Sequence, residues 1–532
     1  MVRKTFLLFS LMMCLAFNSF AQDASFLQKY AEKGDKEAMF NLAQCYIDGT
    51  GGVNQDYNQA TMWLAKAAKK NYAPAQYKLG LCYMYGAGVL TDYSQAWQLI
   101  QKAVKQNYPA AVYTTACCYR DGTYVSQDNQ QWFTWLKNAA QLGDDDALAD
   151  LGYVYLYGFE KLSIQQDFDK ALSLLRKGSE LNNSKANFYL GICYQFGAGV
   201  TADAEKALQY YYAAAQAGHA EAQCEVAEAY IRGINGVDQD FSEAHKYINA
   251  AAQQESPRAY KLLADVYYYG LGVDEDNEKA AEWYKKAVDA GNLDAISQLA
   301  YMYLYGIGVG ENEPKAFQLY KQAADAELSS GYAGLGMCYE NGYGCTKSIP
   351  TAVTYYKKAA DENNNYSLHR LYFIYKEGEG VTKDTQAAIQ YLRQAADNGY
   401  NNAIYSLGYE YLVGEILHQE NSSALDYIKK AADGGYSFAC AVLGTFYYDG
   451  EPLVEKDFNK AFKYLSEAAR DAQSINEGLL STVYKDLGAC YRFGRGTEAD
   501  QSMASYYTEQ AAKLGDKSSL ESVKLLRNKD IK

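Results

Sequence analysis

The cysteines and histidines are the residues of this chain best suited to metal or redox chemistry. The sequence holds 11 cysteines and four histidines. A zinc site needs clustered cysteine and histidine ligands at set spacings. The histidines are scattered, and none lies near a paired cysteine, so the sequence predicts neither a metal nor a cofactor. They are His219, His245, His369 and His418.

A second stretch of chemical interest is GYGCTKS, residues 342–348. It is superficially similar to a phosphate-binding loop, but it lacks the GxxxxGK[ST] spacing and no predicted strand precedes it. A turn followed by a helix-capping Ser348 is the favoured interpretation. A nucleophilic triad needs a serine on a strained turn beside a positioned histidine, and no such combination is found. The chain is therefore predicted not to be an enzyme.

One small residue recurs along almost the whole chain and reveals its organisation. Around it the sequence is nearly repeated, as in LGLCYMYGAGV (79–89) and LGICYQFGAGV (190–200). Ten of the twelve intervals between copies are 36 or 37 residues. Such a period indicates a solenoid, whose units bury their apolar faces against neighbouring units. The thirteen anchors are Ala43, Gly80, Ala116, Gly152, Gly191, Ala227, Ala264, Ala300, Gly336, Tyr372, Gly408, Gly444 and Gly488.

The residues around each anchor predict a helix, a turn and a second helix. A tyrosine three positions after the anchor shares a helix face with it in all thirteen copies. The small anchor allows close approach of the next helix, and the ring fills the gap beside it. Six positions after the anchor a glycine, from Gly49 to Gly494, can end the helix in the left-handed conformation. Asp, Asn or Ser then provides an N-cap in twelve copies, and only Glu420 departs.

This pattern resembles the Sel1-like repeat family, a relative of the tetratricopeptide repeats. The family motif is an LGxxYxxGxGV helix and turn followed by KAxxWYxKAAxxG. Residues 263–273 (LADVYYYGLGV) and 280–291 (AAEWYKKAVDAG) match it closely. The resemblance covers roughly residues 25–516. It implies an all-α, right-handed αα-hairpin solenoid of about thirteen repeats, whose first helices line a concave surface.

The cysteines raise the question of disulfides, because secreted cysteine-rich members of this family staple the two helices of a repeat. Here six cysteines occupy the position two residues after the anchor, which is apolar in other copies. Equivalent positions of stacked repeats lie about 8–10 Å apart, too far for a disulfide. Buried thiols are therefore favoured. Cys117 beside Cys118, and Cys338 with Cys345, remain open as pairs.

The first residues predict export. Arg3 and Lys4 precede a short apolar stretch, and Ala21 offers a small residue for cleavage. That stretch is too short to span a bilayer, and no later segment is apolar enough, so no membrane span is predicted. We expect a periplasmic or secreted chain. An endoplasmic reticulum lumen stays open because glycosylation-type triplets begin at Asn182, Asn365 and Asn421.

The chain is accordingly divided into four parts: residues 1–21 as signal peptide, 22–36 as N-terminal lead-in, 37–516 as repeat solenoid and 517–532 as C-terminal capping helix. Its formal net charge is −14, without runs of Lys or Arg. This charge argues against nucleic acid as a partner. It is compatible with simple solubility or with a basic partner.

Candidate binding residues come from positions of the first helix that packing does not require. These are one, four and five residues after the anchor, and their residue types vary between copies. Aromatic side chains gather there in copies four to eight, where a protein, peptide or sugar could bind. The alternative is that some rings only pack between helices. The candidates are Tyr153, Tyr157, Phe196, Tyr268, Tyr269, Tyr301 and Tyr305.

The function predicted from the sequence is a non-catalytic adaptor in the cell envelope that binds a protein or peptide ligand on the concave face. A cell-wall glycan or peptidoglycan is the alternative ligand. A cell-wall-type hydrolase ranks last, because secreted relatives have been linked to such substrates but the chain offers no matching set of residues.

Overall fold

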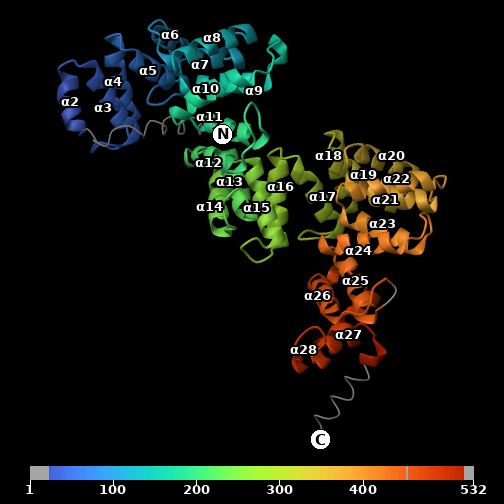
Figure 1. Cartoon of the computed structure of the whole chain (residues 1–532). Coiled ribbons are helices and arrows are strands. Elements are labelled where there is room, and N and C mark those ends of the chain that lie inside the picture. The colour runs from blue at the N-terminus through green and yellow to red at the C-terminus, as the bar shows by residue number, and fades with distance from the viewer. Residues whose placement is uncertain (1–22, 451–452, 520–532) are drawn as a thin grey trace. The chain divides into compact units, whose positions relative to one another are not determined.

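The computed structural model describes residues 23–450 and 453–519. The predicted signal peptide and most of the predicted capping helix therefore lie outside the described residues. The chain divides into two compact units, one ending at Glu275 and the other beginning at Asp276. Each unit is a stack of antiparallel helix pairs (Figure 1). No strand is present in the described ranges, and one isolated bridge joins Phe159 to Ile164.

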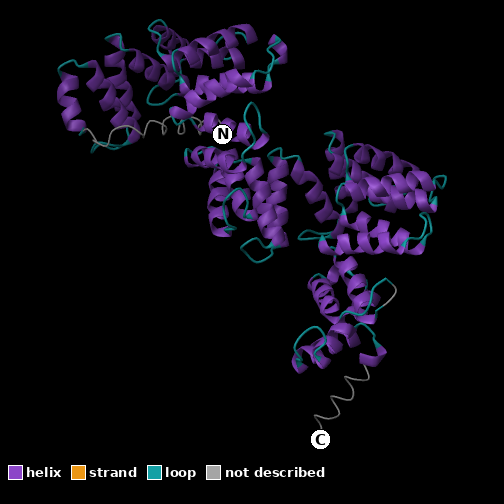
Figure 2. Ribbon diagram, in the orientation of Figure 1, coloured by secondary structure: helices purple, strands orange, loops and turns teal. Residues whose placement is uncertain are grey.

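Each repeat copy supplies a first and a second helix, joined by a short loop (Figure 2). The first helices are α3 (Lys36–Asp48), α5 (Ala73–Tyr85), α7 (Pro109–Asp121), α9 (Asp145–Tyr157), α11 (Ser184–Phe196), α13 (Ala220–Arg232), α15 (Pro257–Tyr269), α17 (Asp294–Tyr305), α19 (Ser329–Asn341), α21 (Asn365–Glu377), α23 (Asn401–Val413), α25 (Ser437–Asp449) and α27 (Glu477–Phe493). The second helices are α4 (Tyr57–Lys69), α6 (Tyr93–Val104), α8 (Asn129–Gln141), α10 (Phe168–Glu180), α12 (Ala204–Gln216), α14 (Phe241–Gln253), α16 (Asn277–Asp289), α18 (Glu313–Asp325), α20 (Ile349–Asp361), α22 (Thr385–Asp397), α24 (Asn421–Asp433), α26 (Phe458–Arg470) and α28 (Gln501–Lys513).

Three short elements lie outside this scheme. The helix α2 (Ala24–Glu32) occupies the predicted lead-in and packs its apolar side on α3. The single-turn helices η1 (Glu160–Leu162) and η2 (Ala472–Ser474) lie where the fourth and thirteenth copies carry extra residues. The extra residues of copy four form loop structure, whereas part of those before copy thirteen lengthens α27 to 17 residues, and both leave the helix pairs intact.

Caps define both ends of the loop within each hairpin. The predicted glycine is left-handed in twelve copies, and the exception, Gly158 with φ 76° and ψ 175°, precedes the inserted residues of copy four. The Asp, Asn or Ser before the second helix accepts a backbone N–H bond in twelve copies, whereas Glu420 makes no such side-chain bond. Ser348 is one of these caps, as the helix-turn interpretation of GYGCTKS predicts.

A backbone hydrogen bond also closes the hairpin loop. In twelve copies the N–H of the capping residue donates to the carbonyl oxygen of the repeated tyrosine, as from Asp92 to Tyr83 at 3.0 Å. The enlarged loop of copy four keeps this bond, from Asp167 to Tyr155 at 2.8 Å. The tyrosine position therefore closes the loop through its backbone, which any residue type could supply.

Twelve of the thirteen anchors are Gly or Ala, because the second helix of the same copy packs directly on them, and the exception is the buried Tyr372. A Cβ placed on Gly191 would lie 2.4 Å from the ring of Tyr211, and one on Gly336 would lie 2.5 Å from the ring of Tyr356. Contacts this short are not tolerated between carbon atoms. The close helix approach predicted from the sequence is thus confirmed.

The second glycine of the loop has a different partner, in the preceding copy. A Cβ on Gly88 would lie 2.1 Å from the carbonyl oxygen of Tyr57, in the first turn of α4. Gly308 against Asn277 and Gly496 against Phe458 repeat this arrangement. In the copies that carry this glycine, the loop thus rests on the start of the second helix one copy earlier.

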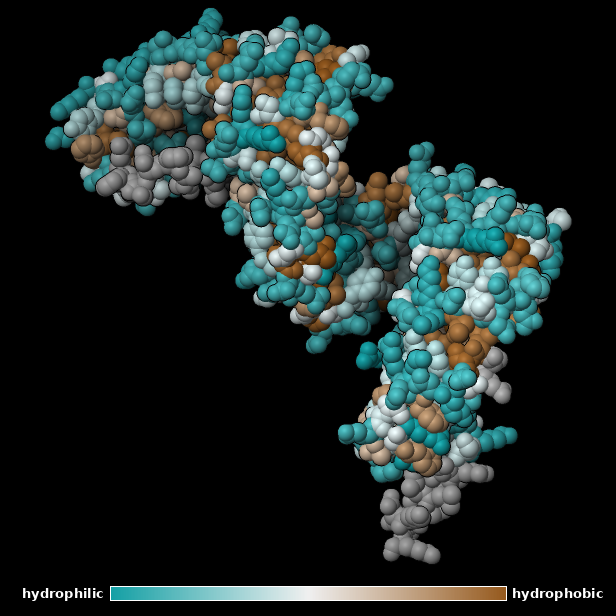
Figure 3. Space-filling view, in the orientation of Figure 1, coloured by the Kyte–Doolittle hydropathy of each residue, from teal (hydrophilic) through white to brown (hydrophobic). Residues whose placement is uncertain are grey.

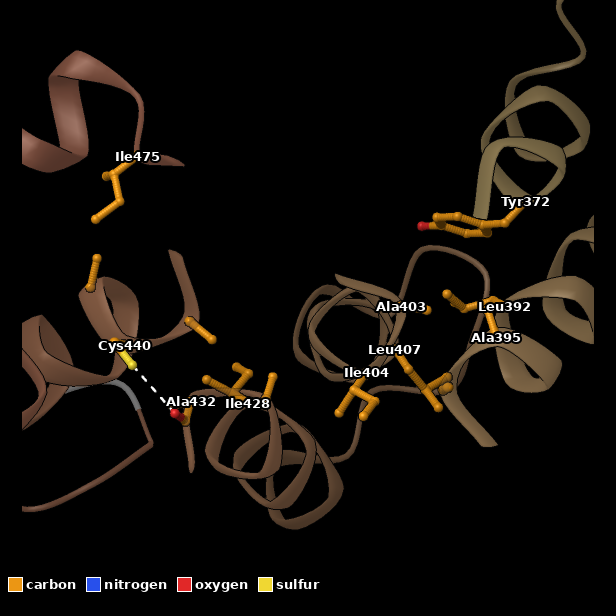
Figure 4. Close-up of a cluster of buried hydrophobic side chains, with 14 of the residues drawn as sticks. Tyr372, Leu392, Ala395, Ala403, Ile404, Leu407, Ile428, Ala432, Cys440 and Ile475 are labelled. Carbon is orange, nitrogen blue, oxygen red and sulfur yellow. Dashed lines mark hydrogen bonds between the residues drawn. The ribbon is translucent and has the colours of Figure 1, made fainter. Parts of the chain in front are cut away.

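Apolar side chains from neighbouring helices form the core, as several clusters along unit 1 and as one large cluster between Ile349 and Leu487 in unit 2. Figure 4 shows part of the core of unit 2, where Leu407, Ile404 and Ile428 meet between helix pairs. The Cys440 thiol lies in this core and donates to the Ala432 carbonyl at 3.4 Å. All ten cysteines of the described ranges are free thiols and most are buried, as the sequence analysis favoured.

One expectation about the helix surface is wrong. The position four residues after the anchor is not generally free, because Ile47, Leu156 and Leu304 are buried there. This position lies one helical turn beyond the anchor and so shares its buried face. The position five residues after the anchor is exposed in all thirteen copies.

Candidate functional site

Three of the predicted aromatic residues lie together in unit 1, on the neighbouring helices α9 and α11. Tyr153, Tyr157 and Phe196 are 44%, 52% and 73% exposed. The rings of Tyr153 and Tyr157 lie one turn apart with centroids 4.9 Å from each other. Phe196 occupies in α11 the position that Tyr157 occupies in α9, and these helices contact each other. We call these three residues, with Tyr189, the aromatic face.

Tyr189 belongs to the aromatic face although the sequence analysis did not select it. Its ring centroid lies 5.1 Å from that of Tyr153 and joins α11 to α9. Burial, and next the charge of Asp150, raise the pKa of Tyr189 to about 12, so its hydroxyl stays protonated. Tyr189 stands two residues before its anchor, a position that the sequence analysis did not consider. Its contact with Tyr153 joins two neighbouring copies, so predicting it requires knowing how the copies stack on each other.

The other predicted residues form two separate pairs. Tyr268 and Tyr269 end α15 in unit 1, with ring centroids 4.9 Å apart; Tyr269 is 56% exposed and Tyr268 is half-buried. Tyr301 and Tyr305 lie on α17 in unit 2, with centroids 4.6 Å apart. The Tyr305 hydroxyl donates to the Met337 sulfur at 3.6 Å. The seven predicted residues therefore do not form one site within either unit.

Charged side chains lie on the first helices of unit 1 near the aromatic face. Lys185 of α11 has its ammonium 3.4 Å from carboxylate oxygens of both Asp146 and Asp150 of α9. Asp150 also accepts from the Tyr113 hydroxyl at 2.7 Å. These interactions connect three consecutive copies, and the sequence analysis missed them because their partners lie 35–39 residues apart.

A second charged group follows on α13 and α15. The Arg258 guanidinium lies 2.7 Å from Glu225 and from Glu228, and 3.7 Å from Glu221. Burial alone lowers the pKa of Arg258, but the hydrogen bonds and charges of Glu225 and Glu228 raise it overall. Glu228 also lies 3.9 Å from the guanidinium of Arg232. Three carboxylates therefore share two cations, which leaves one negative charge in excess.

Two of the histidines, His219 and His369, are held by packing and hydrogen bonds within the repeats. Burial lowers the pKa of His219 and of His369 to about 4, so both rings are neutral at pH 7. His219 caps α13 and stacks on Phe188, and His369 bonds to the Ser406 hydroxyl at 2.9 Å. Within the described ranges no three His, Cys, Asp or Glu side chains are grouped to hold a metal ion.

Asp486 is a buried carboxyl group in α27 with an oxygen that has no hydrogen-bond partner. Burial raises its pKa to about 7; Lys485 opposes this rise, and Asp449 and Asp516 add to it. The folded chain therefore holds this proton more tightly than the unfolded chain, whose aspartate titrates near pH 4. Folding stability should fall as pH rises from about 4 to 7, with the full penalty above 7.

Asp486→Asn is accordingly expected to stabilise the last repeats at pH 8 by about 1–2 kcal/mol, because it removes a charge but still buries a polar amide. Urea unfolding of both proteins at pH 4.5 and pH 8 measures this. The exposed Asp426→Asn provides the comparison. An equal effect of Asp486→Asn at both pH values would contradict the prediction.

No helix in the described part of the chain has both the length and the apolarity needed to cross a membrane. Hydrophilic side chains cover most of the face seen in Figure 3, with hydrophobic side chains in separate patches between them.

Comparisons with known proteins match the observed architecture. The structure of c5321, a protective antigen present in uropathogenic Escherichia coli strains displaying an SLR fold, is similar over 93% of this chain and 96% of that chain, with 25% identity and a TM-score of 0.52. Chitin synthase regulatory factor 2 of Schizosaccharomyces pombe is 33% identical over 117 residues, 21% of this chain and 23% of that protein. DAP3-binding cell death enhancer 1 of Rattus norvegicus is 39% identical over 170 residues, 32% of each chain. The chain thus spans less than a third of either relative's length.

A family model described as Sel1 repeat matches nearly all of the region between residues 36 and 516. The matched segments are 36–72, 73–108, 109–144, 145–183, 184–219, 220–256, 257–292, 293–328, 329–364, 367–400, 401–436, 437–472 and 484–516. Sel1 repeat proteins generally mediate protein–protein interactions, and the fold is typically a non-catalytic scaffold. With thirteen matched copies and the stacked αα-hairpins that they predict, the chain belongs to the Sel1 repeat family.

Proposed function

We propose that this chain is an exported, non-catalytic scaffold of the cell envelope that binds a protein or peptide segment. The binding surface is the aromatic face of unit 1, on the first helices that are expected to line the concave side. The observation that carries this proposal is the exposure of Tyr153, Tyr157 and Phe196 on two adjacent helices.

Exposed aromatic rings on rigid helices are suited to binding. Aromatic side chains bury a large area at a small cost in side-chain entropy and are frequent anchors of protein interfaces. Helices α9 and α11 hold these rings in place because Gly152 and Gly191 let their partner helices pack closely. A phenyl ring that is 73% exposed, as Phe196 is, gains from being covered by a partner.

The test is capture of partners from an envelope extract. The mature chain is immobilised as wild type and as Tyr157→Ala/Phe196→Ala, after circular dichroism shows that both are folded. Tyr93→Ala is the matched control, since Tyr93 is 54% exposed in the same unit but lies on a second helix. We expect a protein that wild type and control retain and that the double variant loses at least tenfold.

Other outcomes would redirect the proposal. Equal retention by all three baits would place the binding surface elsewhere, and Tyr301→Ala/Tyr305→Ala would test unit 2. Retention of muropeptides without any protein would favour the glycan alternative. Turnover of a cell-wall substrate that survives purification would contradict a non-catalytic role.

Export has its own test. The chain expressed with its full N-terminus should be recovered outside the cytoplasm with Gln22 as its first residue, because Ala21 is the predicted cleavage position. N-terminal sequencing of the fractionated protein measures this. An intact Met1 in the cytoplasmic fraction would contradict export.

A further inference from the structure

The helix α2, which precedes the first repeat, presents two aromatic rings to solvent. Its apolar side, formed by Ala24, Leu27 and Ala31, is buried against α3. Phe26 and Tyr30 lie one turn apart on the solvent side and are 54% and 42% exposed. Their ring centroids are 4.8 Å apart, so the two rings form one apolar patch.

Exposed lysines lie beside this patch on the same helix. The spacing of Lys29 and the C-cap Lys33 places both side chains on the solvent side with Phe26. The Lys33 ammonium lies 5.7 Å from the centre of the Tyr30 ring. The one acidic residue within α2, Glu32, lies on its flank and accepts a hydrogen bond from Gln28 at 2.9 Å. We call Phe26, Lys29, Tyr30 and Lys33 the α2 face.

Further lysines from copy one surround the turn that follows α2. The Lys70 ammonium lies 3.2 Å from the position that a Cβ on Gly34 would take. The Lys36 ammonium lies 5.4 Å from the centre of the Tyr72 ring. Residues 29–37 and the last turn of α4 with its cap therefore combine six lysines with three carboxylates. The lysines are Lys29, Lys33, Lys36, Lys66, Lys69 and Lys70, and the carboxylates are Glu32, Asp35 and Glu37.

This local positive charge persists although the whole chain has a formal charge of −14. At 0.1 M salt, interactions between exposed charges are screened beyond about 10 Å. The helix α2 is the first described helix of unit 1 and contacts α3 (Figure 1). An anionic surface that touches it therefore meets mainly lysines and two aromatic rings. Lysines and aromatic rings together are typical of surfaces that rest in the headgroup region of a lipid bilayer.

We propose that the α2 face attaches the chain to an anionic lipid bilayer without crossing it. Phe26 and Tyr30 enter the headgroup region. Lys29 and Lys33 lie beside them and pair with lipid phosphates. A second copy of the chain fits this face less well, because two α2 faces placed together would bring their lysines into contact. This attachment is separate from the aromatic face and goes beyond the proposed function.

Sedimentation with lipid vesicles tests the attachment. The mature chain is mixed with vesicles of phosphatidylcholine alone, or with phosphatidylglycerol as about one lipid in three. We expect binding to the anionic vesicles to be about tenfold tighter or more, and to be lost at high salt. Hydrogen exchange of the wild-type chain should slow in α2 when anionic vesicles are added and stay the same in α14.

Two variants of the α2 face locate the effect, after circular dichroism shows that both are folded. Lys29→Gln/Lys33→Gln should weaken binding to the anionic vesicles about tenfold or more, since each lysine near an anionic surface strengthens binding about fivefold. Phe26→Ser/Tyr30→Ser should weaken it about fivefold or more, because the rings no longer enter the headgroup region. Lys137→Gln/Lys177→Gln removes the same charge from exposed positions of α8 and α10 and should leave binding unchanged.

Several results would overturn the attachment. These are equal binding to both kinds of vesicle, binding that both α2 variants keep, or vesicle protection that is absent from α2. A dimer that Phe26→Ser/Tyr30→Ser dissociates, without any vesicle binding, would assign the face to a second copy. Binding of a soluble acidic protein in place of vesicles would likewise overturn the lipid surface.

The attachment and the proposed function fail independently. Both α2 variants should still retain the envelope protein that the aromatic face binds. Tyr157→Ala/Phe196→Ala should lose that protein and still bind anionic vesicles. Vesicle binding lost in Tyr157→Ala/Phe196→Ala and kept in the α2 variants would move the lipid contact to the aromatic face and overturn this inference.

Discussion

Gly88→Ala is expected to lower the free energy of unfolding of the first repeats by about 3–5 kcal/mol. Gly88 has a φ of 70°, which strains any residue with a Cβ, and the new Cβ would lie 2.1 Å from the Tyr57 carbonyl oxygen. That oxygen is part of the backbone at the start of α4, so relief requires the two copies to separate. Hydrogen exchange of α4 and α5 in increasing urea measures the loss locally.

Gly52→Ala separates the effect of backbone strain from the effect of the close contact with Tyr57. Gly52 has a φ of 86°, but no atom lies within 4 Å of the position of its Cβ. Only backbone strain is expected here, about 1–2 kcal/mol. Equal losses for both variants would show that contact with the preceding copy contributes nothing.

Lys376→Met is expected to destabilise unit 2 by about 3–5 kcal/mol, because it leaves a buried carboxylate without its cation. The Lys376 ammonium lies 2.7 Å from Glu410, whose side chain is completely buried. Only the Tyr372 hydroxyl and the Ile416 N–H then remain as donors to Glu410. Chemical denaturation with hydrogen exchange in α21 and α23 measures the effect.

The double variant Lys376→Met/Glu410→Met should recover at least half of this loss, since no charge stays buried. Lys347→Met is the matched control: it removes an exposed lysine 3.6 Å from an exposed Glu379 and should cost less than about 1 kcal/mol. A double variant less stable than Lys376→Met would show that Glu410 has a structural role of its own.

The repeat unit could be predicted from the sequence because its signals are local. The anchor, the tyrosine three positions later and the helix-ending glycine lie within seven residues, and each has one main physical explanation. Glu420 is an example: the one residue that departs from the N-cap pattern in the sequence is the one that makes no side-chain cap in the structure. Such signals need no knowledge of how the copies stack.

Contacts between copies could not be predicted in this way. The carboxylates that hold Arg258 lie 30–37 residues earlier in the chain, and the positions involved vary from copy to copy. The same reason explains why Tyr189 was missed, whereas the burial of Ile47, Leu156 and Leu304 follows from the helix period and could have been predicted. The exposed residues Tyr157 and Phe196 could be selected because their position is exposed in every copy.

The backbone bond from the capping residue to the tyrosine carbonyl has a practical consequence for engineering. It fixes the two ends of each loop next to each other, whatever lies between them. In copy four it spans eleven intervening residues, Leu156 to Gln166, against eight between Tyr83 and Asp92. The loops of the other copies are therefore natural sites for grafting foreign peptide sequences. A chain built this way can acquire a new epitope by insertion without rebuilding its helices.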